Sequence, residues 1–188
     1  MPNEDFDGKS DQAGGVNEQI SRLRESIRRA FPAEPYVGKV TEYDDELSSE
    51  LREDQAILDE DQYLFRALKG AKWTEVPKQL LENLPDGYEL LSDEAFVAFL
   101  PAWLARALDD MDSENDVRNF VVYAFSPKTD MVPDTTDRIL GRLRLLSSEQ
   151  RSVVRSLLVE FCERGTAPFV RALAVKAVAL IDKLGERN

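Results

Sequence analysis

The spacing of the apolar residues most constrains how this chain can fold. From Asn17 onward they recur at intervals of three and four, as in Ile20, Leu23 and Ile27. That spacing places apolar side chains on one face of a helix, whereas a half-buried strand would alternate every second residue. The stretch Tyr36 to Tyr43 could be extended, but one short segment has no second strand to pair with. We therefore predict an all-α protein, a compact single-domain array of about seven or eight short helices.

The N-terminal residues differ in composition from the rest of the chain. Residues 1–16 include Gly8, Gly14 and Gly15 with several acids and few apolar side chains. Such a segment buries too little apolar surface to offset the entropy that it would lose on ordering. We therefore predict a disordered acidic tail over 1–16 and a single helical domain over 17–188.

Local signals predict where several helices begin and end. Ser92 precedes a periodic apolar run and is expected to cap a helix. Ser147 and Gln150 fit a capping box, in which each side chain bonds the other residue's backbone. Gly70 is expected to end a helical pattern that starts near Asp44. Whether the stretch from 44 to 68 is one helix or two stays open.

The run from Leu90 to Leu108 contains a proline in its middle. Pro101 lacks a backbone donor and crowds the preceding turn, which breaks or kinks helices. We expect two short helices that meet at Pro101, with Phe99 and Trp103 in the core.

The composition excludes several kinds of catalytic site. The chain has no histidine, so it cannot build a Ser-His-Asp triad, a Cys-His pair or an imidazole general base within itself. Its one cysteine, Cys162, cannot form an intramolecular disulfide or a multi-thiolate metal site, and is expected to be a small buried core residue. No glycine pattern typical of phosphate binding is present. We identify no catalytic residue and expect no cofactor and no metal.

The acidic segment from Asp109 to Asp116 has the charge of a calcium loop but not its pattern. With Asp110 in the first position, the sixth would be Asn115 and the twelfth Val121, where such a loop requires Gly and Glu. We expect a linker between two helices whose acids cap the second one.

Charge is unevenly distributed along the chain. There are 36 Asp+Glu against 24 Lys+Arg, a net charge of -12, and residues 42–61 carry ten acids against Arg52 alone. This balance argues against direct binding to nucleic acids or anionic membranes. We expect the run 42–61 to be a solvated helix face; the alternative is a docking surface for a basic partner. The candidate partner residues are Asp44, Asp45, Glu46, Glu50, Glu53 and Asp54.

Targeting and membrane signals are not recognisable in the sequence. Residues 1–5 are acidic and no apolar stretch follows them, unlike a secretory signal. The longest apolar stretch, 167–181, is interrupted by Arg171 and Lys176 and falls short of the roughly 18 residues that a membrane span needs. We expect a cytoplasmic protein without a membrane partner.

The run from Leu91 to Leu104 reads L-S-D-E-A-F-V-A-F-L-P-A-W-L. It resembles the L-S/T-x-E-A-F-x-x-Y/F-L-P-A-Y/F/W-L signature of an uncharacterised family of small bacterial proteins. The family also tends to show a helix ending in Ala-Phe, here residues 30–31, a Trp after a short turn, here Trp73, and L-S/T-x-E-Q, here residues 146–150. The resemblance implies an all-helical domain of unknown function and assigns no activity, cofactor or catalytic residue.

Three classes of function follow from these features. We expect a non-enzymatic protein that binds another protein, because catalytic residue types are scarce and the surface is acidic. One alternative is an acidic nucleic-acid mimic, whose carboxylates occupy a basic protein in place of phosphates. The other is a carboxylate-based enzyme, which would need two carboxylates in opposed environments. A ligand groove would be lined by Trp73, Trp103 and Tyr123, and the oligomeric state is not predicted.

Overall fold

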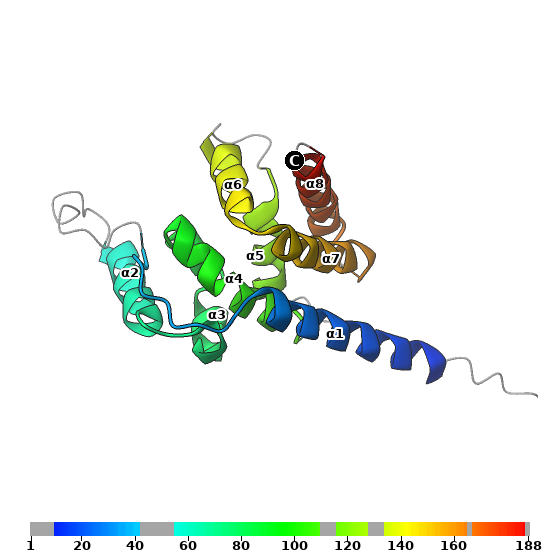
Figure 1. Cartoon of the computed structure of the whole chain (residues 1–188), viewed down its shortest axis with the longest axis horizontal. Helices are drawn as coiled ribbons and strands as arrows, with labels where there is room; N and C mark the ends of the chain where they lie inside the picture. The colour runs from blue at the N-terminus through cyan, green and yellow to red at the C-terminus, as the bar shows by residue number, and fades with distance from the viewer. Residues whose placement is uncertain (1–9, 42–54, 110–115, 128–133, 165–166, 187–188) are drawn as a thin grey trace, which may run out of the picture.

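The computed structural model describes residues 10–41, 55–109, 116–127, 134–164 and 167–186, which form eight α-helices (Figure 1). In chain order they are α1 (Ser10–Ala30), α2 (Gln55–Leu68), α3 (Lys78–Asn83), α4 (Asp93–Ala107), α5 (Asp116–Phe125), α6 (Asp134–Leu145), α7 (Ser148–Arg164) and α8 (Pro168–Gly185). Two 3₁₀ turns, η2 (Trp73–Glu75) and η3 (Gly87–Glu89), flank α3. The predicted all-α, compact architecture is confirmed.

The helix α4 lies in the middle of the molecule (Figure 1). It contacts α1, α3, α5, α6 and η2. Residues on different sides of α4, among them Phe99, Pro101 and Leu104, are buried. A helix that is covered all round is apolar all round, rather than along one stripe. The helix α4 is therefore the centre of the hydrophobic core.

The prediction of two helices that meet at Pro101 is wrong, because α4 runs unbroken through that residue. A proline inside a helix costs about 3 kcal/mol through its missing donor and its clash with the previous turn. The neighbours Phe99 and Trp103 are 0% and 1% exposed, which confirms their predicted place in the core. Burying a large apolar side chain contributes about 1.5–3 kcal/mol. Packing on both sides of the proline therefore outweighs its cost.

The predicted helix ends are confirmed at three places. The Ala95 N–H donates to Ser92 Oγ at 3.2 Å, so Ser92 caps α4. The Gln150 N–H donates to Ser147 Oγ at 3.1 Å, and the Ser147 N–H donates to Gln150 Oε1 at 2.9 Å, which completes the capping box of α7. Gly70 has a φ of +74° just after α2 ends, a conformation that favours glycine.

The first helix is longer than predicted. It begins at Ser10, so residues 10–16, which composition assigns to the tail, are helical. The packed part of α1 contains the buried residues Leu23 and Ile27. Once packing has nucleated a helix, each further residue adds a hydrogen bond, so the helix can continue past its packed face. The N-terminal end of α1 accordingly extends away from the other helices (Figure 1).

An extended segment before α2 is tied to the start of α4. Thr41 forms an isolated antiparallel bridge with Leu91. The Ser92 N–H donates to the Val40 carbonyl at 3.0 Å. This bridge is the one β pairing within the ranges described above, and it forms no sheet. It fixes the position of Leu91, whose carbonyl oxygen also takes part in one of the sites below.

The C-terminal helices α7 and α8 pack against each other. Arg155 on α7 donates two hydrogen bonds to the Asp182 carboxylate on α8, at 2.6 and 3.1 Å.

Among the helices that the structure describes, none combines the length and the apolar character needed to cross a bilayer.

Candidate functional site

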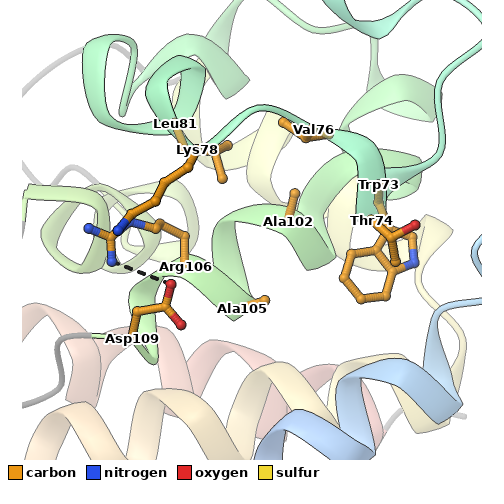
Figure 2. Close-up of a pocket in the computed structure, with 9 residues that line it drawn as sticks. All are labelled: Trp73, Thr74, Val76, Lys78, Leu81, Ala102, Ala105, Arg106 and Asp109. Carbon is orange, nitrogen blue, oxygen red and sulfur yellow. Dashed lines mark ion pairs between the residues drawn. The ribbon is translucent and has the colours of Figure 1, made fainter.

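A groove lies between η2, α3 and the C-terminal half of α4 (Figure 2). Its volume is about 200 Å³. We call it the Trp73 groove, and it is lined by Trp73, Thr74, Val76, Lys78, Leu81, Ala102, Ala105, Arg106 and Asp109.

The floor of the Trp73 groove is apolar and firmly held. The Trp73 indole N–H donates to the Phe31 carbonyl at 3.0 Å, and this tryptophan is only 9% exposed. Ala102 and Ala105 lie three residues apart on α4, so they share one helix face. Because both are small, the helix surface there is recessed beside the indole (Figure 2). The floor therefore presents a preformed apolar depression.

One end of the Trp73 groove is charged. Arg106 pairs with Asp109 at 3.6 Å, as the dashed line in Figure 2 marks, and with Glu82 at 2.8 Å. Glu82 also pairs with Lys78 at 3.6 Å, and Asp109 with Arg24 at 2.8 Å. The Arg106 side chain is 10% exposed, while the two carboxylate side chains are 39% and 38% exposed. A chain of alternating charges thus closes this end, and Arg106 is its most buried member.

A second, smaller hollow of about 60 Å³ lies between η3, α5 and α6. We call it the Tyr88 hollow, and it is lined by Tyr88, Glu89, Tyr123, Ala124, Arg138, Ile139 and Arg142.

A buried arginine forms one wall of the Tyr88 hollow. Arg142 is 4% exposed, its Nε donates to Asp93 at 2.9 Å and its Nη2 donates to the Leu91 carbonyl at 2.9 Å. Its guanidinium also lies 4.3 Å from the centre of the Phe96 ring. Burial lowers the pKa of Arg142, and the positive charge of Arg138 lowers it further, while the bond to Asp93 opposes them.

Residues 20–178 match the sequences described as Family of unknown function (DUF6714). The chain belongs to this family. The prediction of membership in a family of unknown function is therefore confirmed. No curated protein and no solved structure matches the chain. Because the match runs from α1 into α8, both the Trp73 groove and the Tyr88 hollow lie within the DUF6714 domain.

The three residues expected to line a groove are separated in this DUF6714 domain. Trp73 lines the Trp73 groove, and Tyr123 lines the Tyr88 hollow. Trp103 is 1% exposed, and its indole N–H donates to the Pro85 carbonyl at 3.1 Å. Successive residues of a helix point about 100° apart, so Trp103 projects from a different side of α4 than Ala102, which lines the Trp73 groove. Neither of the two hollows holds all three side chains.

Of the acidic run 42–61, the structure describes only residues 55–61. The six candidate partner residues, Asp44, Asp45, Glu46, Glu50, Glu53 and Asp54, lie outside the described residues. At the end of the run Glu60 is exposed, but Asp61 is 6% exposed. The expected solvated face therefore does not include Asp61.

Cys162 is half-buried rather than fully buried, and its thiol is free. Burial raises its pKa, the positive charge of Arg171 opposes that rise, and Glu163 adds to it. The thiol is thus mainly protonated near neutral pH.

Sequence reasoning missed Tyr88, Arg106 and Arg142 as site residues. Arg106 follows the long apolar run of α4, and Arg142 lies between the core residues Ile139 and Leu143. A charged residue at a core-facing helical position is rarely buried without a partner. The position of these two arginines within apolar helical patterns could therefore have indicated buried ion pairs. Tyr88 lies in a short turn between α3 and α4, where periodicity gives no information.

Chemically, the Trp73 groove offers apolar contact and ion pairing. The Trp73 indole N–H is already bonded, which leaves the Thr74 hydroxyl and the charged end as polar groups. In the part of the chain that the structure covers, no three His, Cys, Asp or Glu side chains are placed to share a metal ion. The arrangement is suited to binding another molecule.

Proposed function

We propose that this chain is a non-enzymatic protein-binding module, and that the Trp73 groove receives an apolar side chain from a partner protein. The observation that carries this proposal is the apolar floor of Trp73, Leu81 and Ala102, closed at one end by the Arg106–Asp109 pair. Protein interfaces concentrate binding energy where an apolar anchor fills a preformed pocket beside polar groups.

The size of the groove favours a side chain over a free small molecule. Sites for cofactors and drug-sized ligands usually have volumes of roughly 300–1,000 Å³. The Trp73 groove, at about 200 Å³, is smaller than that range. One leucine, phenylalanine or tryptophan side chain is an occupant of suitable size. Such a residue would contact the accessible part of Trp73 and lie over the two alanines of α4.

The charges favour a basic partner. The chain carries a net charge of -12, which speeds association with positively charged proteins. Glu82 and Asp109 stand at the charged end with more than a third of their side chains exposed. A lysine or arginine next to the apolar anchor could pair with either carboxylate. We therefore infer that the partner segment combines an apolar anchor with an adjacent basic residue.

The non-enzymatic part of the proposal rests on the residue types available. The chain has no histidine, and burial keeps Cys162 mainly in the weakly nucleophilic thiol form. The carboxylates of Glu82 and Asp109 are both paired with arginines. We place the module in the cytoplasm, where a free thiol persists. The nucleic-acid mimic depends on residues 42–61, most of which lie outside the described residues, so no observation favours it.

Filling the groove tests the proposal. Ala105→Leu adds bulk to the floor, and Ala172→Leu adds the same bulk to an exposed position on α8. Each variant would be used in affinity capture with cross-linking from cells that make the protein, after circular dichroism has shown unchanged folding. We expect Ala105→Leu to reduce recovery of the partner about tenfold, equivalent to a loss of about 1.4 kcal/mol in binding.

The Ala172→Leu protein should recover the partner as the wild type does. Recovery should also decrease at high salt, because screening weakens attraction between exposed charges. Equal recovery by both variants would show that the groove does not bind the partner.

A further inference from the structure

Among the residues that the structure describes, the Tyr88 hydroxyl has no hydrogen-bond partner. Tyr88 is 4% exposed, and its oxygen accepts from and donates to none of the described residues. Buried polar groups are nearly always satisfied, so one that is not requires an explanation. The Tyr88 ring packs edge-on against Phe96, with 6.1 Å between the ring centres, so the hydroxyl is held in place.

Arg142, which lines the same hollow, uses only part of its guanidinium for bonds to described residues. The Nε and Nη2 of Arg142 donate to Asp93 and to the Leu91 carbonyl. Within the described ranges, the Arg142 Nη1 makes no hydrogen bond. Burial raises the pKa of Tyr88, and the negative charge of Glu89 adds to the rise, so the hydroxyl keeps its proton at neutral pH. Two hydrogen-bond donors, one of them charged, therefore line one small cavity.

We propose that the Tyr88 hollow binds a small oxyanion, a carboxylate or phosphate group, through the Tyr88 hydroxyl and the Arg142 guanidinium. An anionic oxygen accepts hydrogen bonds strongly, and a guanidinium matches the geometry of such groups. One buried water needs roughly 10–15 Å³ of such space, so a cavity of about 60 Å³ has room for a group of a few heavy atoms. The cavity does not have room for a nucleotide.

The surrounding charges favour a singly charged group. Arg138 also lines the hollow, and its Nη2 donates to the Glu89 carbonyl at 3.0 Å and the Leu91 carbonyl at 3.2 Å. Two guanidiniums therefore face two carboxylates: that of Asp93, which is paired with Arg142, and that of Glu89, which is exposed at the rim. Because these four charges sum to zero, the second charge of dianionic phosphate gains no net attraction while its desolvation costs more, so a carboxylate should bind more tightly than dianionic phosphate. This inference is independent of the Trp73 groove.

A nuclear magnetic resonance titration of the full-length protein tests the site. The amides of Ala124 and Ile139, which line the hollow, would be followed as sodium acetate, inorganic phosphate or acetyl-glutamate-amide is added. Sodium chloride controls for ionic strength. We expect saturable shifts of these two amides with acetate and none with chloride. The proposal is overturned if none of the three probes gives a saturable shift, or if the saturable shifts lie elsewhere in the molecule.

Tyr88→Phe removes the hydroxyl and keeps the ring. It should weaken acetate binding by about tenfold, the loss of one charge-assisted hydrogen bond. Tyr63→Phe removes a hydroxyl from a tyrosine that is 43% exposed on α2, and it should bind as the wild type does. Unchanged binding by Tyr88→Phe overturns the proposal. If Tyr88→Phe does not fold, the wild-type titration tests the proposal: saturable shifts at Ala124 and Ile139 support the site, and saturable shifts elsewhere overturn it.

The three probes also distinguish the source of the oxyanion. Tighter binding of acetyl-glutamate-amide than of acetate would identify an acidic side chain of a protein as the ligand. Tighter binding of acetate or phosphate would identify a free small anion. Either result supports binding in the Tyr88 hollow, provided that Tyr88→Phe weakens the binding.

Discussion

Two buried arginines lie at opposite ends of α4, and their surroundings differ. Arg106, at the C-terminal end, is 9% exposed and pairs with two carboxylates, those of Glu82 and Asp109. Arg142 reaches the N-terminal end from α6, is 4% exposed and pairs with one carboxylate, that of Asp93, and one carbonyl, that of Leu91.

The two arginines differ in how exposed to water their hydrogen-bond and ion-pair partners are. Both carboxylates at Arg106 are more than a third exposed, so water can solvate them if the arginine is lost. Leu91 is 0% exposed, so its carbonyl depends on the guanidiniums that donate to it. An arginine thus closes the Trp73 groove at the C-terminal end of α4, whereas another arginine donates to a buried backbone carbonyl at the N-terminal end.

Removing Arg142 should have the largest effect. Arg142→Met keeps most of the side-chain volume but takes a donor from the Leu91 carbonyl and a partner from Asp93. We expect a loss of about 2–4 kcal/mol in the free energy of unfolding, measured in urea. The matched control is Arg144→Met, at an exposed position of the same helix, which should change it by less than about 0.5 kcal/mol. Similar losses in both would show that the Arg142 contacts do not stabilise the fold.

Removing Arg106 should lower the free energy of unfolding by less than removing Arg142 does. In Arg106→Met, Glu82 becomes solvated, and Asp109 keeps its pair with Arg24 at 2.8 Å. We expect a loss of about 1–2 kcal/mol in the same unfolding experiment. Lys78→Met, which removes a more exposed partner of Glu82, serves as the control and should cost less still. A larger loss in Arg106→Met than in Arg142→Met would reverse the comparison between the two ends.

Two tyrosine variants should differ by about 1 kcal/mol. Tyr88→Phe removes a buried hydroxyl without a partner, so the free energy of unfolding should stay unchanged or rise in a buffer without carboxylate or phosphate. Tyr36→Phe removes a hydroxyl that donates to the Lys39 carbonyl at 2.8 Å, so it should lower stability by about 1 kcal/mol. Thermal melts of the two variants side by side would measure the difference. An equal loss in both would mean that the Tyr88 hydroxyl is already bonded in the protein.

The exposed pair of α7 and α8 should have the smallest effect. The hydrogen bond from Arg155 lowers the pKa of Asp182 below its ordinary value of about 3.8, although partial burial opposes this. The ionised carboxylate therefore contributes stability above that value, and the contribution is lost as the pH falls through the lowered pKa. Asp182→Asn should cost less than about 1 kcal/mol at neutral pH and nothing in strong acid. Unfolding curves at several pH values check this, and a difference that persists in strong acid would contradict it.

Sequence reasoning was most reliable where a structure depends on neighbouring residues. The Ser92 cap, the Ser147–Gln150 box and the left-handed Gly70 each involve residues a few positions apart. Reasoning failed at Pro101, because the cost of a proline is local but the packing that offsets it comes from distant helices. The expected groove was incomplete for the same reason: only the fold shows that Trp73 faces Ala102 and Ala105.

The sequence by itself determined the fold class, the membership of a family of unknown function, and the absence of histidine chemistry. These follow from apolar spacing, a recognisable run of residues and composition, none of which requires knowledge of distant contacts. Only the tertiary structure decided that Tyr88, Tyr123 and Arg142 surround one hollow, and that Arg106 closes a groove beside Trp73. Tyr88 and Arg142 are separated by more than fifty residues, and their meeting depends on how η3 and α6 pack around the same central helix.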